Sequence, residues 1–307
     1  MNITLKQLRY LIAVADTLHF GKAAENCCIS QPALSLQIQS LEENLGISLI
    51  ERNKQRVLIT PLGNEIIQRA RFILGDVNEL IETAQSNCEP LTNPLSLGVI
   101  PTIGPYLLPK ILPKLRQAYP DLSLILQEEK TYLLLQRLRE GQLDLALLAL
   151  PIEIGDLMSQ DIAEEPFVVA MPSKHPLCKQ KVITESTLAE QQVLLLEDGH
   201  CLRQHALSVC KQMGAKEQTQ VQASSLGTLT QMVANGFGIT LLPVTSLTRE
   251  AYQQNDLEIR HFKPPIPSRR LGFVWRRTSG RLKEFQILIN FFKPLVERII
   301  EENNRDY

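Results

Sequence analysis

A short segment in the second half of the chain places two thiols near basic side chains. Cys201 lies between His200 and Arg203, and a second thiol, Cys210, follows nine residues after Cys201. Imidazole and guanidinium groups stabilise a nearby thiolate, and Gly199 is typical of a turn at a helix start. Cys201 is therefore a candidate low-pKa nucleophile, whereas Cys210, in an apolar context, is expected to be buried and unreactive.

The spacing of these two thiols limits how they can react with each other. If the stretch between them is helical, a rise of ~1.5 Å per residue places their Cα atoms roughly 13 Å apart, beyond the ~7 Å limit for a disulfide. Cys201 and Cys210 could then join only if the helix unfolds. Oxidation of Cys201 to a sulfenic acid and capture by Cys210 would act as a switch. On the residues alone, two unrelated cysteines and a surface histidine remain the alternative.

The part of the chain that must position these thiols alternates strands with helices. The candidate strands are Leu95–Ile100, Leu122–Glu128, Leu143–Leu150, Phe167–Met171 and Gly238–Leu242. This alternation predicts an α/β domain after Pro94. Ligands in such folds bind beyond the carboxyl ends of the strands, which places Thr102 at the mouth of a cleft, although Thr102 could equally cap a helix.

The first sixty residues predict three short helices. Thr4 opens a capping box for a first helix that ends near Leu18, and a second helix is expected over Gly21–Cys27. Ser30 is expected to cap a third helix, and Gly46 is expected to end it.

The outward face of the third helix and the segment after it carry polar side chains. On the helix these are Gln31, Ser35 and Gln39, beside Pro32. Residues 49–60 then predict two strands around a tip that bears Arg52, Lys54 and Arg56. Such a helix suits the major groove of DNA, and such a wing suits phosphates or the minor groove. A small packed domain without a DNA role fits the same periodicity.

A regular apolar spacing continues after Pro61. The repeating residues are Ile66, Ala70, Ile73, Val77, Leu80 and Ala84. Their alternating spacings of four and three are typical of a coiled-coil seam, so this helix needs a partner, unless it packs on its own chain. Ser86–Pro94, with two prolines and two asparagines, is the predicted hinge to the next domain.

Composition sets the broad class of protein. A chain of 307 residues with 44% hydrophobic content suits two or three globular domains. The N-terminus has neither a signal-peptide core nor a membrane span, so we expect a cytoplasmic protein with no membrane contact, its six cysteines reduced. The net charge is −1 and the first sixty residues hold six Lys and Arg against five Asp and Glu, so charge alone does not predict nucleic-acid binding. No cofactor or metal site is expected.

Residues 20–53 strongly resemble the helix-turn-helix and wing of LysR-type transcription regulators. The matching positions include Ala23-Ala24, Ser30-Gln31-Pro32-Ala33-Leu34-Ser35 and Leu41-Glu42. The resemblance implies that Gln31, Pro32, Ser35 and Arg52 lie at or near double-stranded promoter DNA. It also implies a homodimer through the linker helix, which would place two DNA-binding domains on a pseudo-palindromic site.

The same resemblance implies an α+β multidomain architecture. A winged helix-turn-helix is expected over residues 1–60, a dimerising linker helix and hinge over 61–94, and an α/β regulatory domain over 95–307. The regulatory domain would have two subdomains, as in periplasmic binding proteins. Subdomain I would span 95–163 and 269–307, and subdomain II would span 164–268.

The thiol segment resembles the redox motif of the peroxide-sensing branch of the LysR family. The match covers Gly199 to Arg203 with a second cysteine at 210, and extends to Pro101–Pro109 and Gly238–Pro243. It implies that hydrogen peroxide oxidises Cys201, that Cys210 resolves the product into a reversible disulfide, and that the switch controls oxidative-stress genes. The residues implied to bind or polarise the peroxide are Thr102, His200 and Arg269.

The branch resemblance also implies a homotetramer that works with RNA polymerase and a thiol reductant. One departure is Gln204-His205, where many members have Asp-Gln, which removes a carboxylate near the reactive sulfur. The alternative is a LysR regulator that responds to a small organic metabolite in the same cleft. An enzyme, such as a Cys-His hydrolase or a thiol peroxidase, is not expected, because adjacent residues rarely orient as a nucleophile and its base.

Overall fold

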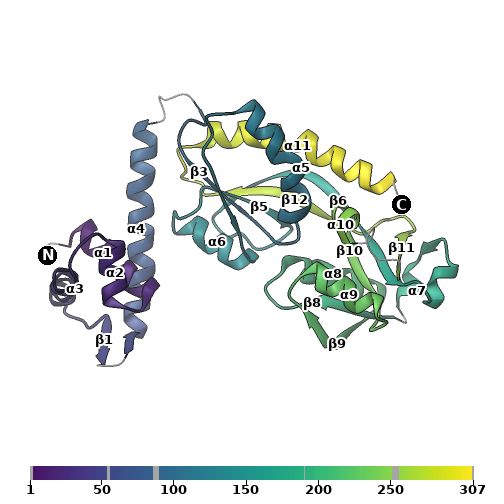
Figure 1. The fold of residues 1–307 in the computed structure, drawn as a ribbon, viewed down its shortest axis with the longest axis horizontal. Coiled ribbons are helices and arrows are strands. Elements are labelled where there is room, and N and C mark those ends of the chain that lie inside the picture. Colours follow the sequence, from purple (N-terminus) through teal and green to yellow (C-terminus); the bar gives the residue numbers. More distant parts are fainter. Residues whose placement is uncertain (1–2, 54–55, 86–89, 190, 251–255, 306–307) are drawn as a thin grey trace. The chain divides into compact units, whose positions relative to one another are not determined.

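The structure is a computed structural model that describes residues 3–53, 56–85, 90–189, 191–250 and 256–305 (Figure 1). The chain forms two compact units. The first comprises Met1–Asn87 with Arg139–Gln142, and the second comprises Cys88–Leu138 with Leu143–Tyr307. None of the helices in the described ranges is long and apolar enough to cross a membrane.

The first unit begins with the three predicted helices, α1 (Leu5–Thr17), α2 (Phe20–Asn26) and α3 (Gln31–Leu45). Their capping signals are confirmed. Thr4 N donates to Gln7 Oε1 at 2.9 Å while Gln7 N donates to Thr4 Oγ1 at 3.3 Å, which completes a capping box. Ser30 Oγ accepts from Ala33 N at 3.4 Å at the start of α3, and Gly46 ends α3 in the left-handed conformation.

One face of α3 is buried in the core of this unit. Leu34, Ile38 and Leu41 are fully buried and pack with Leu11 and Val14 of α1. The predicted inner face of the third helix is therefore confirmed. Because this face is committed to the core, the opposite face of α3 is left for solvent or a partner.

The wing follows as a hairpin of β1 (Ile50–Asn53) and β2 (Arg56–Ile59), which pair antiparallel. Glu42 of α3 holds its first strand, because Glu42 Oε1 accepts from Leu49 N at 2.7 Å and from Ile50 N at 3.0 Å. A side chain of α3, the helix predicted to enter the major groove, thus fixes where the wing begins.

The long helix α4 (Pro61–Gln85) divides its apolar seam between two environments. Ile67 and Ala70 are buried in the first unit. Ile73 is 45% exposed and Leu80 is 71% exposed. The first turns therefore pack on the same chain, whereas the later turns expose apolar side chains, and a partner for them stays a prediction. The side chain of Ala84 lies outside the described part of the helix.

The second unit is built on an eight-stranded sheet of order β4-β3-β5-β12-β6-β11-β7, with β10 also paired with β6. The strands are β3 (Leu95–Val99), β4 (Leu124–Glu128), β5 (Leu145–Leu150), β6 (Met158–Pro172), β7 (Val182–Ile183), β10 (Thr240–Pro243), β11 (Leu257–Phe262) and β12 (Ser268–Trp275). Strand β3 is parallel to β4 and β5, whereas β12 is antiparallel to β5 and β6. A separate parallel pair is formed by β8 (Gln192–Leu196) and β9 (Lys216–Ala223).

Helices pack on both faces of this sheet and on the β8–β9 pair. They are α5 (Gly104–Ala118), α6 (Thr131–Arg139), α7 (Glu185–Leu188), α8 (Cys201–Met213), α9 (Leu226–Ala234), α10 (Leu247–Glu250) and α11 (Leu282–Arg305), with the short 3₁₀ turns η1 (Pro176–Lys179) and η2 (Val244–Ser246). Figure 1 shows α5 and α11 on one face of the β3–β5–β12 part and α6 on the other. This is the α/β arrangement that the sequence predicted.

Strand β6 is longer than the sequence indicated. The predicted strand Phe167–Met171 is only the second part of Met158–Pro172. Up to Pro166 this strand pairs with β12, and from Phe167 onward it pairs with β10 and β11. The chain therefore passes from one half of the domain to the other along one continuous strand. The subdomain boundaries predicted at 163/164 and 268/269 lie on β6 and at the start of β12.

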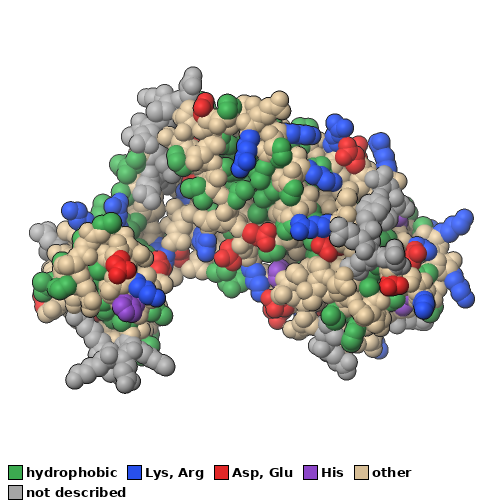
Figure 2. Space-filling model, in the orientation of Figure 1, with side chains coloured by type: hydrophobic (Ala, Val, Ile, Leu, Met, Phe, Trp, Pro, Cys, Tyr) green, Lys and Arg blue, Asp and Glu red, His purple; other side chains and the backbone are tan. Residues whose placement is uncertain are grey.

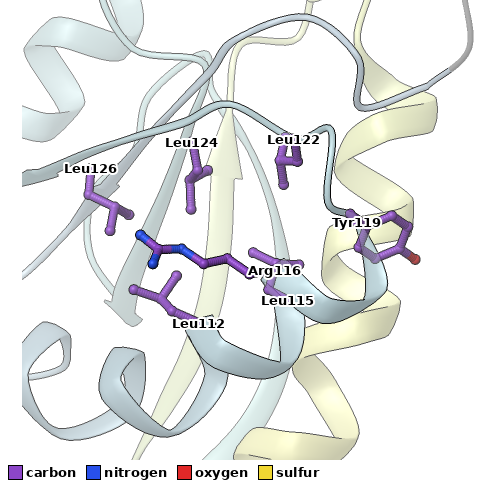
Figure 3. Close-up of a pocket in the computed structure, with 7 residues that line it drawn as sticks. All are labelled: Leu112, Leu115, Arg116, Tyr119, Leu122, Leu124 and Leu126. Carbon is purple, nitrogen blue, oxygen red and sulfur yellow. The ribbon is translucent and has the colours of Figure 1, made fainter.

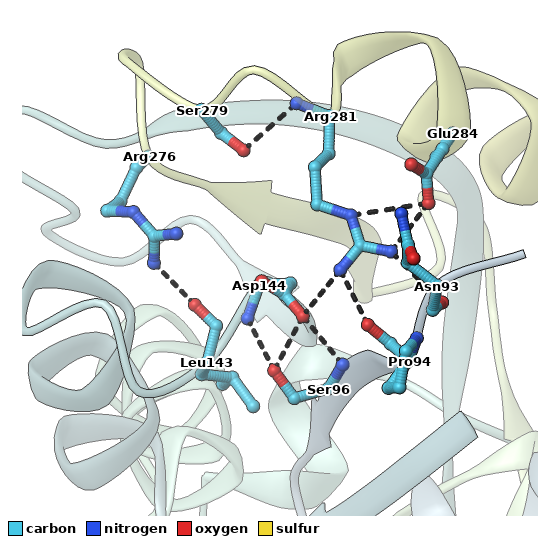
Figure 4. A network of polar contacts seen from close by, with 9 residues as sticks. All are labelled: Asn93, Pro94, Ser96, Leu143, Asp144, Arg276, Ser279, Arg281 and Glu284. Atoms are coloured by element: carbon cyan, nitrogen blue, oxygen red, sulfur yellow. Dashed lines mark hydrogen bonds and ion pairs between the residues drawn. The ribbon is translucent and has the colours of Figure 1, made fainter. Parts of the chain in front are cut away.

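Arg281, at the start of α11, holds the end of the predicted hinge (Figure 4). It donates to Pro94 O at 2.7 Å, to Asn93 O at 3.3 Å and to Asp144 Oδ2 at 3.2 Å. Asp144 in turn accepts from Ser96 N at 2.7 Å. The entry into β3 is therefore fixed to the C-terminal helix, while residues 86–89 of the predicted hinge lie outside the described residues.

The sheet ends at β4 with an apolar edge. On the face drawn in Figure 2, hydrophobic side chains gather over α5 and the adjoining part of the sheet. Ile125 is 50% exposed and Leu126 is 40% exposed. Figure 3 shows the groove that α5 and β4 form, with the Arg116 side chain lying between Leu112 and Leu124. Natural proteins usually cover or charge such an edge, so this surface is suited to self-association.

The contact between Glu42 and the wing leads to a first prediction. Replacing Glu42 by Ala leaves two part-buried backbone donors without their acceptor, which costs about 1–3 kcal/mol. We expect the opening free energy of the Leu49 and Ile50 amides, measured by hydrogen exchange in the full chain, to fall by that amount. The neighbouring exposed Glu43→Ala is the matched control and should change it by less than about 0.5 kcal/mol. Equal effects of the two substitutions would contradict this role for Glu42.

Candidate functional site

The first of the two thiols lies at the beginning of α8. The preceding loop turns at Gly199, whose φ of +94° is a conformation that favours glycine. His200 is the N-cap residue and Cys201 is the first residue of the helix, with its side chain 3% exposed. The sulfur therefore lies at the helix end where free backbone N–H groups favour a negative charge. The predicted turn and helix start are confirmed.

Cys201 borders a cavity of about 210 Å³ formed by the start of α8, helix α6 and the segment after β5. The cavity is lined by Thr131, Tyr132, Leu135, Ile152, Glu153, Gly199, His200, Cys201 and Gln204. Within the described residues, Thr131 Oγ1 and His200 Nε2 are buried and have no hydrogen-bond partner. These two polar atoms and the thiol belong to residues that line the same cavity, which is the arrangement expected of a site for a small polar molecule.

The loop before α8 is tied to the end of β4 by an ion pair. Lys130 Nζ donates to Glu197 Oε1 at 2.6 Å, and His200 Nε2 lies 4.0 Å from the same carboxylate oxygen. Burial lowers the pKa of His200, and the charge of Lys130 lowers it further against the opposing effect of Glu197. The imidazole next to Cys201 is therefore held in its neutral form near pH 7, able to donate from one nitrogen and accept at the other.

Arg203 does not serve the thiol as the sequence indicated. It donates to Asp198 Oδ1 at 2.8 Å and to Leu196 O at 3.1 Å, and it pairs with Glu217 Oε1 at 2.7 Å. Its positive charge is therefore matched by two carboxylates. Arg203 therefore holds the loop before α8 against β9. Its position near Cys201 in the sequence gave no sign of these two partners.

Thr102 and Arg269 are in direct contact, although 167 residues separate them in the sequence. Arg269 donates to Thr102 Oγ1 at 3.0 Å, to Thr102 O at 2.9 Å and to Glu165 Oε2 at 2.8 Å. Glu165 also accepts from Thr245 N at 3.0 Å. All four residues are buried, so this is a sealed and fully paired charge cluster.

The structure thus brings the predicted residues together in two groups. His200 and Cys201 line the cavity, whereas Thr102 and Arg269 form the buried cluster and are not among the lining residues. Two residues of the site were missed by sequence reasoning: Thr131, which directly follows Lys130 after β4, and Glu165, the acid that holds Arg269. Thr131 follows a parallel strand's carboxyl end, which is a signal that could have identified it. Glu165 gave no such signal.

Cys210 lies on the same helix as Cys201, and both thiols are free. The stretch between the two thiols is helical, as the predicted switch requires. Nine helical residues separate the thiols by roughly 13 Å along the axis. Burial raises the pKa of Cys210 from 9.0 to about 11, with a smaller contribution from the negative charge of Glu217. The second thiol is an inert neutral group while α8 stays folded.

The residues that the sequence predicted to contact DNA lie on the predicted helix and wing. Gln31 and Pro32 are exposed in the first turn of α3, and Ser35 is half-buried one turn later. Arg52 lies in β1, but its side chain is outside the described part of the wing. Among the described residues, no cluster of His, Cys, Asp or Glu is suited to hold a metal ion.

Together these features define a class of protein: a helix-turn-helix regulator whose second domain carries a small cavity bordered by a buried thiol. Residues 5–64 match the family described as bacterial regulatory helix-turn-helix protein, lysR family, and residues 89–296 match the LysR substrate binding domain. The chain belongs to the LysR family of transcription regulators, and relatives similar to it over nearly their whole length include OxyR proteins.

Three of these similarities extend over nearly the whole chain. The hydrogen peroxide-inducible genes activator of Pectobacterium carotovorum is 42% identical over 98% of this chain and 99% of that protein. A full-length OxyR from Pseudomonas aeruginosa, with one cysteine replaced by aspartate, has a TM-score of 0.78 at 36% identity over 95% of both chains. A Corynebacterium glutamicum OxyR with bound hydrogen peroxide, a cysteine-to-serine mutant, has a TM-score of 0.67 at 34% identity, covering 100% of this chain and 98% of that one.

The raised pKa of Cys210 leads to a second prediction. At pH 8 a shift from 9.0 to about 11 lowers the thiolate fraction about 100-fold. We expect iodoacetamide to alkylate Cys210 at least about 100-fold more slowly in the reduced native protein than in urea, while exposed Cys28 serves as the accessible control. The folded pKa of Cys210 is higher than the unfolded pKa, so the neutral thiol contributes to the free energy of unfolding. That contribution is complete below pH 9 and is lost as the pH rises towards 11. Native Cys210 reacting as fast as Cys28 would contradict the prediction.

Proposed function

We propose that this protein is a peroxide-responsive transcription regulator that uses Cys201 and Cys210 as a reversible thiol switch. The observation that carries the proposal is the position of Cys201. It is the first residue of α8, it borders a small cavity with two unpartnered polar groups, and it shares its helix with a second thiol. Relatives of this chain include a hydrogen peroxide-inducible genes activator and an OxyR with bound hydrogen peroxide, which support the same sensing role.

The chemistry would proceed in two balanced steps. The Cys201 thiolate attacks one oxygen of hydrogen peroxide, the O–O bond breaks, and the leaving hydroxide takes a proton to become water, which leaves a sulfenic acid on Cys201. The Cys210 sulfur then attacks the Cys201 sulfur, a disulfide forms, and a second water leaves with the proton of Cys210. The two thiols lose two electrons in total and peroxide gains them. A thiol reductant returns these electrons and resets the switch.

Helix α8 must open between the two steps. Its geometry keeps the sulfurs far beyond disulfide distance, and opening also relieves the burial that holds the Cys210 pKa high. Peroxide oxidation therefore exchanges a folded helix for a cross-linked loop. This change is large enough to rearrange the domain that contains it.

His200, Thr102 and Arg269 have distinct roles in the proposal. His200 and Thr131 offer hydrogen bonds to peroxide beside Cys201, because both carry an unpartnered buried polar atom. Thr102 and Arg269 would contact peroxide only if their sealed cluster opens, because they do not line the cavity and the guanidinium is already paired with Glu165.

DNA recognition is assigned to the first unit. Gln31, Pro32 and Ser35 would enter the major groove from α3, and Arg52 of the wing would contact the backbone or the minor groove. The protein would act on promoters of oxidative-stress genes together with RNA polymerase. Because its DNA target and its reductant are cytoplasmic, we place the protein in the cytoplasm.

Two apolar surfaces support a homotetramer. The exposed seam of α4 would form one dimer contact, and the edge of β4 with its groove would form the other. Two different self-complementary contacts on each chain close a set of four subunits. A tetramer has four DNA-binding domains, and this number is suited to binding adjacent half-sites.

The thiol switch is tested by differential alkylation and peptide mass spectrometry before and after about one equivalent of hydrogen peroxide per subunit. We expect a peptide linked through Cys201 and Cys210 that dithiothreitol reverses. Cys201→Ser should abolish the reaction with peroxide, and Cys210→Ser should leave a sulfenic acid that dimedone traps. The matched control is Cys178→Ser, which should behave as the wild type.

Two free thiols after peroxide treatment would overturn the proposal. In that case a response to an organic metabolite becomes the function to test, by a melting shift that survives Cys201→Ser. Consumption of many equivalents of peroxide per subunit with a thiol reductant would instead indicate a peroxidase.

The assembly is tested by sedimentation equilibrium. Leu80→Glu places a charge on the exposed α4 seam, and we expect the tetramer to fall to dimers, with at least about a tenfold weaker association. Adding Ile125→Glu on the β4 edge should give monomers. Gln68→Glu, an exposed position elsewhere on α4, is the control and should remain tetrameric. A Leu80→Glu protein that sediments as the wild type would show that α4 is not a subunit contact.

A further inference from the structure

His205 lies one helical turn after Cys201 on α8, so the two side chains share a face of the helix. Its Nε2 lies 3.1 Å from Pro151 O, in the segment that leaves β5. The hydrogen bond therefore joins the helix that carries both thiols to a strand of the sheet's other half.

The partner of this bond determines the form of the imidazole. A backbone carbonyl only accepts hydrogen bonds, so Nε2 must carry the hydrogen and donate it. The other nitrogen, Nδ1, is buried and has no hydrogen-bond partner among the described residues. Burial lowers the pKa of His205, and the charge of Arg269 lowers it further against the effect of the Pro151 bond. The neutral Nε2–H form is thus the one that fits.

The segment that accepts this bond also forms part of the thiol cavity. Ile152 and Glu153, directly after Pro151, line the cavity opposite His200 and Cys201. One hydrogen bond therefore fixes both the first turns of α8 and the wall that α8 faces. Opening of the helix must break this bond and release the wall at the same time.

We propose that His205 is a positioning residue of the thiol switch. Its Nε2–H holds the start of α8 against the end of β5, and so sets how readily the helix opens to let Cys210 reach Cys201. The first half of this inference concerns the reduced protein alone, and the second half rests on the proposed function. Oxidation would release the Pro151 segment and carry the change from α8 to the other half of the domain.

The experiment compares three variants of the reduced full-length chain. His205→Ala removes the donor, His205→Gln keeps an N–H donor on a side chain of similar reach, and Ser208→Ala alters an exposed position on the same helix. Amide hydrogen exchange is followed over 201–207 and 151–154, and the thiol–disulfide equilibrium is measured in glutathione buffers. Thermal unfolding checks that each variant is folded.

We expect His205→Ala to exchange about two- to tenfold faster in both segments, the range set by the net strength of one hydrogen bond. Its disulfide should be favoured by the same factor, because only the helical reduced state loses the contact. His205→Gln should restore both values to within twofold of the wild type, and Ser208→Ala should leave them unchanged.

Two outcomes would overturn the inference. One is exchange in His205→Ala that stays within twofold of Ser208→Ala, and the other is a folded His205→Gln that behaves as His205→Ala. The proposed function fails separately. If the wild type forms no disulfide while the exchange pattern holds, His205 still positions α8 and the thiol switch is wrong. If the disulfide forms while exchange is unchanged, the switch stands and the role of His205 is wrong.

Discussion

The helical conformation of α8 is the constraint on which the proposed switch depends. A helix extends by about 1.5 Å per residue, so two thiols nine residues apart on one helix cannot form a disulfide while it persists. The same helix buries Cys210 and keeps it neutral, and it presents Cys201 at the end where a negative charge is stabilised. Cys201 is thus held at the cavity while Cys210 stays withdrawn until α8 opens.

The predicted site residues and their partners form two sets of contacts. One set holds the start of α8, and the other is the buried cluster around Arg269. Lys130 with Glu197, and Arg203 with Asp198 and Glu217, hold the loop and the helix start in place. The buried cluster of Thr102, Arg269 and Glu165 is fully paired, so it keeps its shape. The proposed switch would combine this fixed cluster with a helix that opens, so that only one of the two parts moves.

Several surfaces of the chain are left exposed by the fold and are suited to contacts with other molecules. The first unit buries one face of α3 and leaves the other for DNA, and the later turns of α4 and the edge of β4 expose apolar side chains that a single chain does not cover. Exposed apolar surface on ordered elements is energetically unfavourable in water, so these faces are suited to subunit contacts. Assembly would then link the state of α8 in each subunit to the placement of several DNA-binding domains.

Local signals in the sequence were sufficient for much of this protein. Capping residues such as Thr4 and Ser30, the apolar period of α3, the seam of α4 and the start of α8 at Cys201 all depend on neighbours within a few residues, so spacing and residue type determine them. The motif around Cys201 also indicated the chemistry and the family. The length of β6 and the strands β7, β8, β9, β11 and β12 were not among the predicted elements, because their stability comes from pairing with distant segments.

Only the tertiary structure decided which side chains meet. It paired Arg203 with Asp198 and Glu217 rather than with the thiol, brought Arg269 onto Thr102 across 167 residues, and placed His205 against Pro151. It also showed Thr131 beside Cys201. The physical reason is that hydrogen bonds and ion pairs act over a few ångströms between atoms that the fold, not the order of the chain, brings together. The sequence by itself determined the N-terminal helices and the family and predicted the thiol chemistry, and the fold decided which side chains surround the two thiols.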